Sequence, residues 1–316
     1  MAFQPKRVLV LGTTGECGGR IARGCVDAGH KVTGVSRNKN QAPTVNLDGV
    51  ERLQGDKGDP ETFTSVLAGR EFDVVVDAVP KTEDVKLAFE HLNGRIEHYF
   101  MISSTGTYAP LLTCPADESN PWRENTGINF YWQSQRDTYA LELFRDHGFP
   151  ATIFRPTNII GRHRIPLELW GGRNIKYFQL MRQGKTVEIP ECDKILLQSG
   201  CNDDLATAFV LGASKGPEIN GQIYIISCKR AVTFATYFQA AREILDSKSA
   251  VEVIPIDAIM ERRGDDVDLG GMQFLVEHMC FDIGKAEREL GYAPKVSMEQ
   301  GLEQALQWCL DEGLLS

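Results

Sequence analysis

The stretch that decides the fold is residues 8–19, Val-Leu-Val-Leu-Gly-Thr-Thr-Gly-Glu-Cys-Gly-Gly. Its apolar start indicates a buried strand, and residues 20–29, which follow the glycines, are typical of a helix ended by glycine. Gly12 permits a tight turn, Gly15 lets the backbone approach a pyrophosphate, and Gly18 lets the helix pack close to the strand. The stretch therefore predicts a dinucleotide-binding βαβ start, in which the helix N-terminus binds the cofactor pyrophosphate.

Cofactor specificity is set at the end of the second predicted strand, residues 30–35, where an Asp or Glu would bond the ribose hydroxyls of NAD. This chain has Ser36 and Arg37 there, a hydroxyl and a guanidinium that suit a 2′-phosphate. Thr14 lies within the glycine loop, and Asp56, after the third strand, is placed to bond the adenine edge or else to cap a turn. We therefore predict NADP(H) as the cofactor, with NAD as the alternative.

Strand and helix patterns alternate along the chain after this start. Strands are expected at residues 74–79, 99–102, 151–154 and 222–227, and helices at 60–67, 83–92, 139–147 and 203–214. This alternation predicts an α/β Rossmann fold, a doubly wound parallel sheet with helices on both faces. We expect a dinucleotide-binding domain over residues 1–165 and a smaller C-terminal substrate-binding lobe over 166–316, with about 200–230 returning to the sheet.

The composition argues against several classes of function. The net charge of −9 over 316 residues argues against a nucleic-acid partner, because such affinity is built from Lys and Arg on phosphates. No apolar run could cross a bilayer and no signal-peptide core precedes the first strand, so we expect a cytoplasmic protein without a membrane partner. The eight cysteines and six histidines lack metal-site spacing, so no metal is predicted. Reduced, mostly buried thiols are expected, Cys17 included, although Cys17 lies beside a helix start, where a thiolate would be stabilised.

Further motifs, spread over nearly the whole chain, carry a family pattern. They are Gly55-Asp56, residues 72–77 (Phe-Asp-Val-Val-Val-Asp), 102–108 (Ile-Ser-Ser-Thr-Gly-Thr-Tyr), 155–161 (Arg-Pro-Thr-Asn-Ile-Ile-Gly), 203–206 (Asp-Asp-Leu-Ala) and 285–294 (Lys-Ala-Glu-Arg-Glu-Leu-Gly-Tyr-Ala-Pro). With them the chain resembles the extended short-chain dehydrogenase/reductase superfamily of NAD-dependent epimerases and dehydratases. Residues 198–209 look most like an atypical branch that includes the chloroplast stem-loop RNA-binding proteins.

The resemblance implies a set of catalytic residues. In typical members a Tyr with a Lys four residues later transfers the proton, and a Ser or Thr bonds the reacting oxygen. Ser104 matches the Ser, but no Tyr of this sequence has Lys at i+4, and the nearest match is Tyr131 with Gln135. The uncharged Gln135 would not lower the pKa of the Tyr131 phenol as Lys does. We predict Ser104, Tyr131 and Gln135 as catalytic residues. In one alternative, Tyr131 is only an aromatic residue that lines the pocket. In another, Asp117 or Glu118 is the proton-transfer group.

The resemblance also implies substrate contacts, at Asn158 above all. Thr105-Gly106 stand where dehydratases carry Asp-Glu, so sugar dehydration by that acid pair is not expected. The predicted substrate-binding residues are Tyr108, Asn158, Arg162 and Arg173, and His163, Arg164 and Trp170 lie in the same region. A basic exposed loop is the alternative interpretation of this region.

These predictions lead to two hypotheses of function. The first is an NADP(H)-dependent oxidoreductase or epimerase that acts at a hydroxyl or carbonyl carbon of a small polar substrate, sugar-like or nucleotide-linked. The second, motivated by the missing Tyr–Lys pair, is a non-catalytic cofactor-binding module that acts as a redox sensor or an RNA-binding protein. A homodimer is expected through the helices at 83–92 and 139–147, as is common in this superfamily.

Overall fold

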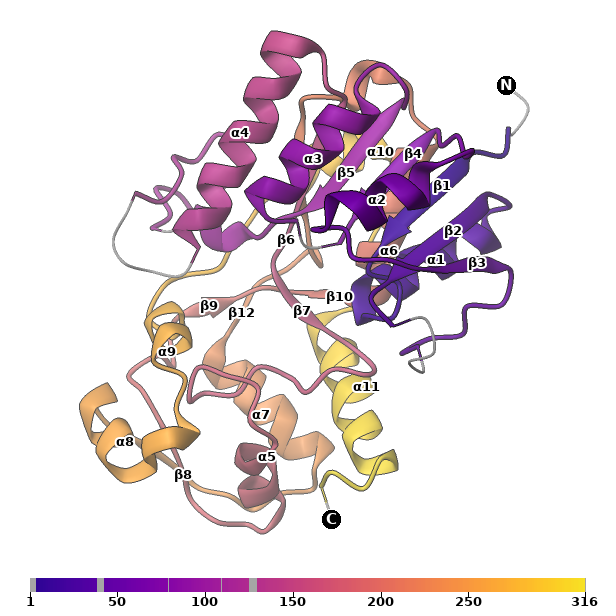
Figure 1. The fold of residues 1–316 in the computed structure, drawn as a ribbon. Helices are drawn as coiled ribbons and strands as arrows, with labels where there is room; N and C mark the ends of the chain where they lie inside the picture. The colour runs from indigo at the N-terminus through magenta and orange to yellow at the C-terminus, as the bar shows by residue number, and fades with distance from the viewer. Residues whose placement is uncertain (1–3, 39–42, 79, 109, 125–129, 316) are drawn as a thin grey trace.

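A seven-stranded parallel sheet forms the centre of the larger lobe (Figure 1). The computed structural model describes residues 4–38, 43–78, 80–108, 110–124 and 130–315. The strands are β1 (Arg7–Leu11), β2 (Lys31–Ser36), β3 (Val50–Gln54), β4 (Val74–Asp77), β5 (His98–Ile102), β6 (Ala151–Pro156) and β11 (Ile223–Ile226). Their order is β11-β6-β5-β4-β1-β2-β3, and every neighbouring pair is parallel. The predicted Rossmann fold is confirmed. Residue 79, the end of one predicted strand, lies outside the described residues.

Helices cover both faces of this sheet because its strands are apolar on both sides. On β1, Val8 and Val10 face a core shared with α1 (Glu16–Asp27), α6 (Asn202–Ala213) and α10 (Gly284–Leu290). Leu9 and Leu11 face the opposite core, which contains α2 (Pro60–Leu67), α3 (Thr82–Leu92) and α4 (Tyr131–His147). Because alternate side chains of a strand point to opposite faces of the sheet, each face of β1 packs against a different layer of helices.

Helix α4 begins at Tyr131, eight residues before the start predicted from the apolar pattern at 139. Its first turns place Ser134, Arg136 and Asp137 at buried positions. Buried polar side chains erase the apolar periodicity on which helix prediction depends. The helix was therefore predicted too short at its N-terminal end.

The C-terminal part of the chain forms a second lobe with its own apolar core (Figure 1). Its helices are α5 (Ile175–Arg182), α7 (Phe234–Ile244), α8 (Ile256–Arg263), α9 (Leu269–Leu275) and α11 (Met298–Asp311). Short strand pairs join β7 (Asn158–Ile160) to β10 (Ser199–Cys201), β9 (Leu196–Leu197) to β12 (Val232–Thr233), and β8 (Val187–Ile189) to β13 (Val251–Val253). The 3₁₀ turns are η1 (Thr105–Thr107), η2 (Pro217–Ile219) and η3 (Gly264–Asp266).

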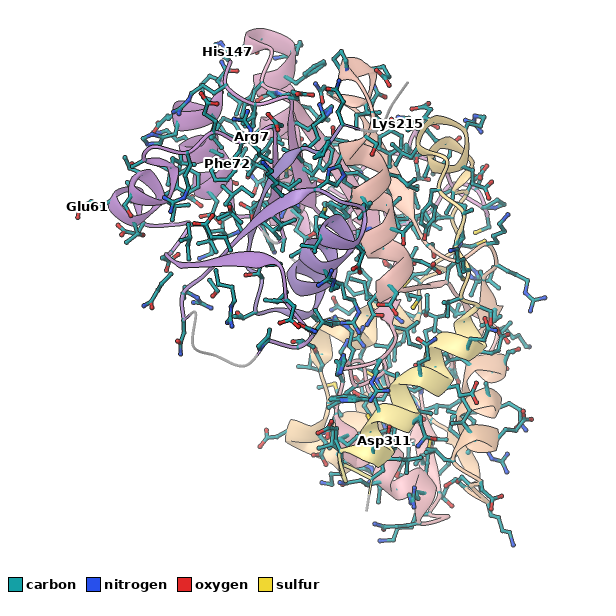
Figure 2. The ribbon with its side chains drawn as sticks, turned by 90° about the vertical axis from the view of Figure 1, so that its right-hand side faces the viewer. Arg7, Glu61, Phe72, His147, Lys215 and Asp311 are labelled. Carbon is teal, nitrogen blue, oxygen red and sulfur yellow. The ribbon has the colours of Figure 1, made fainter. Side chains whose placement is uncertain are left out.

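The chain crosses between the lobes more than once. After β10 it enters α6, which packs on α1, and then β11, which pairs with β6 at the sheet edge. Figure 2 shows Asp311 at the end of α11, in the lobe opposite from His147 at the end of α4. The domain boundary at 165/166 stays a prediction. Among the described residues, no helix has the length and apolar character needed to span a membrane.

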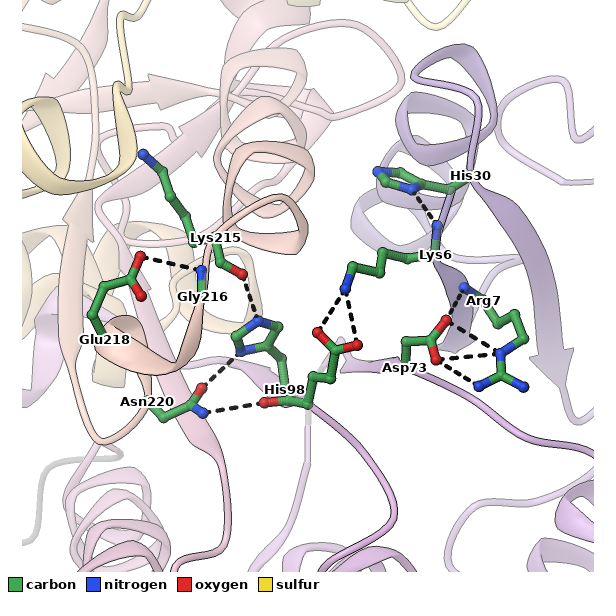
Figure 3. Close-up of polar contacts among 10 residues, drawn as sticks. Lys6, Arg7, His30, Asp73, His98, Lys215, Gly216, Glu218 and Asn220 are labelled. Atoms are coloured by element: carbon green, nitrogen blue, oxygen red, sulfur yellow. Dashed lines mark hydrogen bonds and ion pairs between the residues drawn. The ribbon is translucent and has the colours of Figure 1, made fainter. Parts of the chain in front are cut away.

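Polar contacts close the amino-terminal edge of the sheet (Figure 3). Asp73 accepts hydrogen bonds from the backbone N–H of Arg7 at 2.7 Å and from its guanidinium at 2.6 Å. At the start of β5, two strands from β1, His98 Nδ1 lies 2.7 Å from the Asn220 side-chain oxygen. These contacts connect the segments at the amino-terminal ends of the strands. The cavity described below lies at the opposite, carboxyl-terminal edge.

Candidate cofactor and reaction site

The glycine loop joins β1 to α1 with the geometry that a pyrophosphate site needs. Gly12 has a φ of +92°, and its N–H donates to the Val35 carbonyl at 2.8 Å. A Cβ at Gly18 would lie 2.4 Å from the Gly12 carbonyl oxygen, so only glycine permits this close packing. Gly15 is the N-cap of α1 and offers no side-chain hydrogen bond. The first N–H groups of α1 therefore remain available to an anion.

A cavity of about 870 Å³ lies over this loop at the carboxyl ends of the strands. Its volume is within the range of ligand sites. Besides the loop, its walls come from the ends of β2, β3 and β4 and from the segment after β7. The predicted cofactor residues that line it are Gly12, Thr14, Gly15, Gly18, Arg37 and Asp56. The carboxylate of Asp56 also accepts the Gly58 N–H at 3.0 Å, so it caps the turn while facing the cavity.

Ser36 is the exception among the predicted cofactor residues. Its neighbours Val35 and Arg37 line the cavity, whereas Ser36 itself is buried and absent from the lining. Side chains alternate along a strand, so consecutive residues cannot face the same site. Of the two polar groups predicted for a 2′-phosphate, only the exposed Arg37 is in position.

A buried polar cluster that the sequence did not reveal lies beneath the cavity. Lys57 forms an ion pair with Asp77 at the end of β4 and a second with Asp84 of α3 at 3.3 Å. The Tyr99 hydroxyl donates to Asp77 at 3.1 Å. Burial raises the pKa of Asp77, and the positive charge of Lys57 opposes that shift. The only signal in the sequence was that Lys57 directly follows Gly55-Asp56.

Glu16 connects the glycine loop to the second half of the chain. Its carboxylate accepts hydrogen bonds from Arg164 at 2.8 Å and from the Asn202 amide at 2.6 Å. Asn202 is the first residue of α6, and Arg164 lies after β7 and lines the cavity. Arg164, predicted to line a substrate pocket, thus stands at the cofactor loop.

Cys17 also lines the cavity, and its thiol is not activated. Burial raises the pKa of Cys17 to about 11, with the nearby carboxylate of Glu16 acting in the same direction. The helix start therefore does not produce a thiolate here. All eight cysteines are free, and the described residues contain no group of three His, Cys, Asp or Glu that could hold a metal ion.

Ser104 follows β5 and begins the turn η1. The side chain is half-buried, and its Oγ accepts the Gly106 N–H at 3.1 Å. Because Oγ serves as the acceptor in this bond, its own O–H can donate to a substrate oxygen. Its role in binding the reacting oxygen stays a prediction.

The predicted partners Tyr131 and Gln135 lie one turn apart at the start of α4. They line a separate hollow of about 370 Å³ together with Trp122 and Arg123, and share no lining residue with the cofactor cavity. Gln135 is exposed and Tyr131 half-buried. The structure thus does not bring this pair to the cofactor cavity, and a role for Tyr131 in proton transfer stays a prediction.

The side of α4 that faces Ser103 carries a buried ion cluster. Asp137 accepts hydrogen bonds from the Ser103 hydroxyl at 2.6 Å, from Arg136 at 2.7 Å and from Arg155 at 2.9 Å. The side chains of Arg136, Asp137 and Arg155 are fully buried. Arg136 also donates to the Pro80 carbonyl at 2.8 Å. The cluster fixes α4 against the end of β5, directly beside Ser104.

The structure places Tyr108, which was predicted to contact substrate, in the core rather than at the surface. Its side chain is fully buried, and the Arg155 guanidinium lies 4.4 Å from the centre of its ring. Burial raises the pKa of Tyr108 to about 12, although Arg155 acts in the opposite direction. Tyr108, four residues after Ser104, is therefore a core residue.

The other predicted substrate residues form internal contacts. Asn158 is half-buried and bonds Ser199 at 2.9 Å through Nδ2 and Arg173 at 2.8 Å through Oδ1. Arg173 also donates to the carbonyls of Ile159 and Ile165, and burial lowers its pKa to about 10. Arg173 is therefore a structural cation rather than an open anion site.

Arg162 and Trp170 lie in different surroundings, one exposed and the other in the core. The Arg162 side chain is 57% exposed and 3.9 Å from Asp311 of α11. Trp170 is fully buried and donates to the Glu188 carbonyl at 3.0 Å. The sequence could not show which side chains of this basic region point inward.

A family model described as NAD(P)H-binding matches residues 12–171 of this chain. Among curated proteins, the chain is 27% identical over 322 residues to the chloroplast stem-loop binding protein of 41 kDa b of Arabidopsis thaliana, covering 95% of this chain and 78% of that protein. It is 24% identical to a 2-alkyl-3-oxoalkanoate reductase of Stenotrophomonas maltophilia, covering 94% of this chain and 98% of that protein.

Solved structures show the same fold. An epimerase of Methanothermobacter thermautotrophicus aligns with a TM-score of 0.77 at 18% identity, over 99% of this chain and 94% of that chain. At this identity the likeness concerns the fold. The predicted resemblance to the extended short-chain dehydrogenase/reductase superfamily, and to stem-loop binding members, is confirmed by these matches together.

Proposed function

This chain belongs to the NAD(P)H-binding family, and on that premise we propose that it is an NADP(H)-dependent oxidoreductase or epimerase. It acts at a hydroxyl or carbonyl carbon of a small polar substrate, sugar-like or nucleotide-linked. The observation that carries the proposal is the cavity that joins the uncapped N-terminus of α1 to Arg37 at the end of β2.

The choice of NADP(H) rests on the charge at the end of β2. Arg37 lines the cavity there, and the residues on either side of it, Ser36 and Asn38, carry no carboxylate that would repel a 2′-phosphate. A guanidinium bonds phosphate oxygens in pairs. Arg37 therefore favours the phosphorylated cofactor.

The nicotinamide cofactor, when bound, supplies or accepts the hydride. The chain's own residues hold the substrate oxygen and move the proton. Ser104 donates its O–H to that oxygen, and the buried Asp137 cluster holds the end of β5 in place beside it. Tyr131 is our candidate for proton transfer, although Gln135 stands where typical members carry the lysine.

Binding of NADPH and NADH to the purified chain, followed by fluorescence, tests the cofactor assignment. We expect NADPH to bind at least about tenfold more tightly than NADH, and Arg37→Ala to remove most of that preference while leaving NADH affinity unchanged. Equal affinities for both cofactors in the unaltered chain would contradict the assignment.

Turnover of a panel of carbonyl compounds with NADPH tests the chemistry. Ser104→Ala should lower turnover about 100-fold or more with NADPH affinity preserved, and Ser104→Thr should restore part of it. Tyr131→Phe should have an effect of similar size. Turnover unchanged by Tyr131→Phe would remove Tyr131 from the mechanism.

A second candidate function is a cofactor-binding module without hydride chemistry, either a redox sensor or an RNA-binding protein. Helix α4 contains no lysine, and a relative 27% identical to this chain is a stem-loop binding protein. A gel shift with a stem-loop RNA at several salt concentrations tests the RNA-binding form of this second function. Binding of that RNA without turnover of any carbonyl compound would favour this second function.

We also propose that the protein is a cytoplasmic homodimer that pairs through α3 and α4. These helices pack beside each other on one face of the sheet (Figure 1), and α4 exposes 39% of Trp132. Light scattering should give twice the chain mass, and Trp132→Lys should shift it toward one chain. A monomer in the unaltered protein would exclude the dimer.

A further inference from the structure

Two segments far apart in the sequence lie side by side at Ala116 and Phe281. The Ala116 N–H donates to the Cys280 carbonyl at 2.9 Å, and the Asp282 N–H donates to the Ala116 carbonyl at 2.8 Å. These bonds form an isolated parallel β-bridge outside the main sheets. The first segment follows η1 and Ser104, whereas the second precedes α10, so the bridge joins the reaction end of the sheet to the C-terminal part of the chain.

The bridge places two cysteines on neighbouring segments: Cys280 directly precedes the bridged Phe281, and Cys114 lies two residues before the bridged Ala116. Cys114 is exposed and Cys280 is half-buried. The two side chains interact: burial raises the pKa of Cys280, and the charge and hydrogen bonding of Cys114 raise it further. Of the other cysteines, Cys17 is half-buried in the cofactor cavity and the rest are buried in the cores.

We propose that Cys114 and Cys280 are a redox modification site, a pair of thiols that oxidises reversibly to an intramolecular disulfide. The bridge holds the two backbones side by side next to both cysteines, and a disulfide requires that the two Cα atoms lie within about 7 Å. The exposure of Cys114 lets an oxidant reach one thiol first, while the half-buried Cys280 resolves the product. In a reducing cytoplasm, such disulfides are transient and serve redox sensing.

The oxidation balances with a peroxide as oxidant. The Cys114 thiolate attacks one peroxide oxygen, the O–O bond breaks, and a sulfenic acid and the first water form after proton transfer. The Cys280 thiol then attacks the Cys114 sulfur, the S–O bond breaks, and the hydroxyl leaves with the Cys280 proton as the second water. Two thiols thus lose two electrons to one hydrogen peroxide. A dithiol reductant reverses the reaction by thiol–disulfide exchange.

The cross-link would restrain the segment that leads away from Ser104. Phe281, next to Cys280, packs on Tyr108 with ring centres 6.0 Å apart. The Arg155 guanidinium lies over the Tyr108 ring. Phe281 also exchanges hydrogen bonds with Gln198 through both its N–H and its carbonyl. Because the bridge already holds both segments, we expect the disulfide to leave these contacts in place.

The test uses the full chain, fully reduced and then treated with hydrogen peroxide at a small molar excess. We expect a mass loss of two hydrogens and one proteolytic peptide pair joined through Cys114 and Cys280, both reversed by dithiothreitol. The oxidised protein should melt several degrees higher, because the cross-link restricts the unfolded chain.

Three variants decide the assignment. Cys114→Ser and Cys280→Ser should each abolish the linked peptide pair, and the matched control Cys17→Ser should retain it. Cys114 is exposed, so its Ser variant tests the proposal even if Cys280→Ser fails to fold. Oxidation of Cys114 to sulfinic acid with Cys280 still open to alkylation would overturn the proposal, as would a disulfide to any other cysteine. NADPH affinity should change less than about twofold on oxidation, since neither thiol lines the cofactor cavity.

Discussion

The carboxylate of Glu16 lies 2.8 Å from the guanidinium of Arg164, at the N-terminus of α1, where we propose that the pyrophosphate binds. One residue comes from the glycine loop and the other from the segment after β7, 148 positions later. The negative charge of Glu16 interacts with the same helix dipole that would attract a bound anion. The guanidinium of Arg164 can pair with either the Glu16 carboxylate or that anion. Cofactor affinity should therefore depend on both side chains, in opposite directions.

We predict that Glu16→Gln tightens NADPH binding about fivefold and that Arg164→Gln weakens it about tenfold. Calorimetric titration at low and high salt would measure both. Arg162→Gln is the matched control, because that side chain is mostly exposed and its contact with the network is through the backbone carbonyl. Equal affinity in all three variants would show that this ion pair does not adjoin the pyrophosphate.

Gly18 and Gly15 should separate folding from cofactor binding. A Cβ at Gly18 would lie 2.4 Å from a backbone oxygen, whereas one at Gly15 would lie 3.4 Å from its nearest neighbour. Gly18→Ala should lower both the melting temperature and the NADPH affinity, the latter more than about tenfold. Gly15→Ala should leave the melting temperature nearly unchanged and reduce affinity alone. If both variants melt like the parent chain, the close packing at Gly18 is not required.

Asp137 should be one of the most sensitive positions for stability. It is fully buried between Arg136 and Arg155, and removal of its charge would leave two buried cations without their partner. We expect Asp137→Asn to lower the free energy of unfolding by about 3–5 kcal/mol in urea titrations. Asp146→Asn is the control, because the Asp146–Arg145 pair is exposed and should contribute nothing measurable. A small effect at Asp137 would mean that the arginines find other acceptors.

Cys17 should react slowly with alkylating reagents. With a pKa of about 11, about one thiol in a thousand is ionised at pH 8, against about one in ten for a thiol at the ordinary value of 9.0. The rate should rise about tenfold per pH unit between pH 7 and 9.5, since the pKa lies above that range. Peptide mass spectrometry after timed iodoacetamide treatment would measure it. Saturating NADPH should slow it further, and fast labelling of Cys17 at pH 7 would contradict the assignment.

The sequence by itself determined the fold and the cofactor loop. Residues 8–19 combine an apolar strand, glycines at fixed spacing and a helix start, which are local properties that neighbours in the chain decide. The predicted helix at 60–67 matches α2, because Asp59 caps it and Pro60 occupies its first turn. Arg37 lines the same cavity as the glycine loop because it follows β2, the strand that pairs with β1.

Only the tertiary structure decided where the other side chains point. Ser36 turns away from the cavity through strand alternation, and Tyr108 is buried under Arg155, which lies 47 positions later in the chain. The Asp137 cluster and the Glu16–Arg164 pair join segments with no common local pattern. Local periodicity reports which residues form an element, but burial and charge pairing depend on contacts across the fold. The glycine loop could therefore be predicted from the sequence alone, whereas the side-chain arrangement around Ser104 could not.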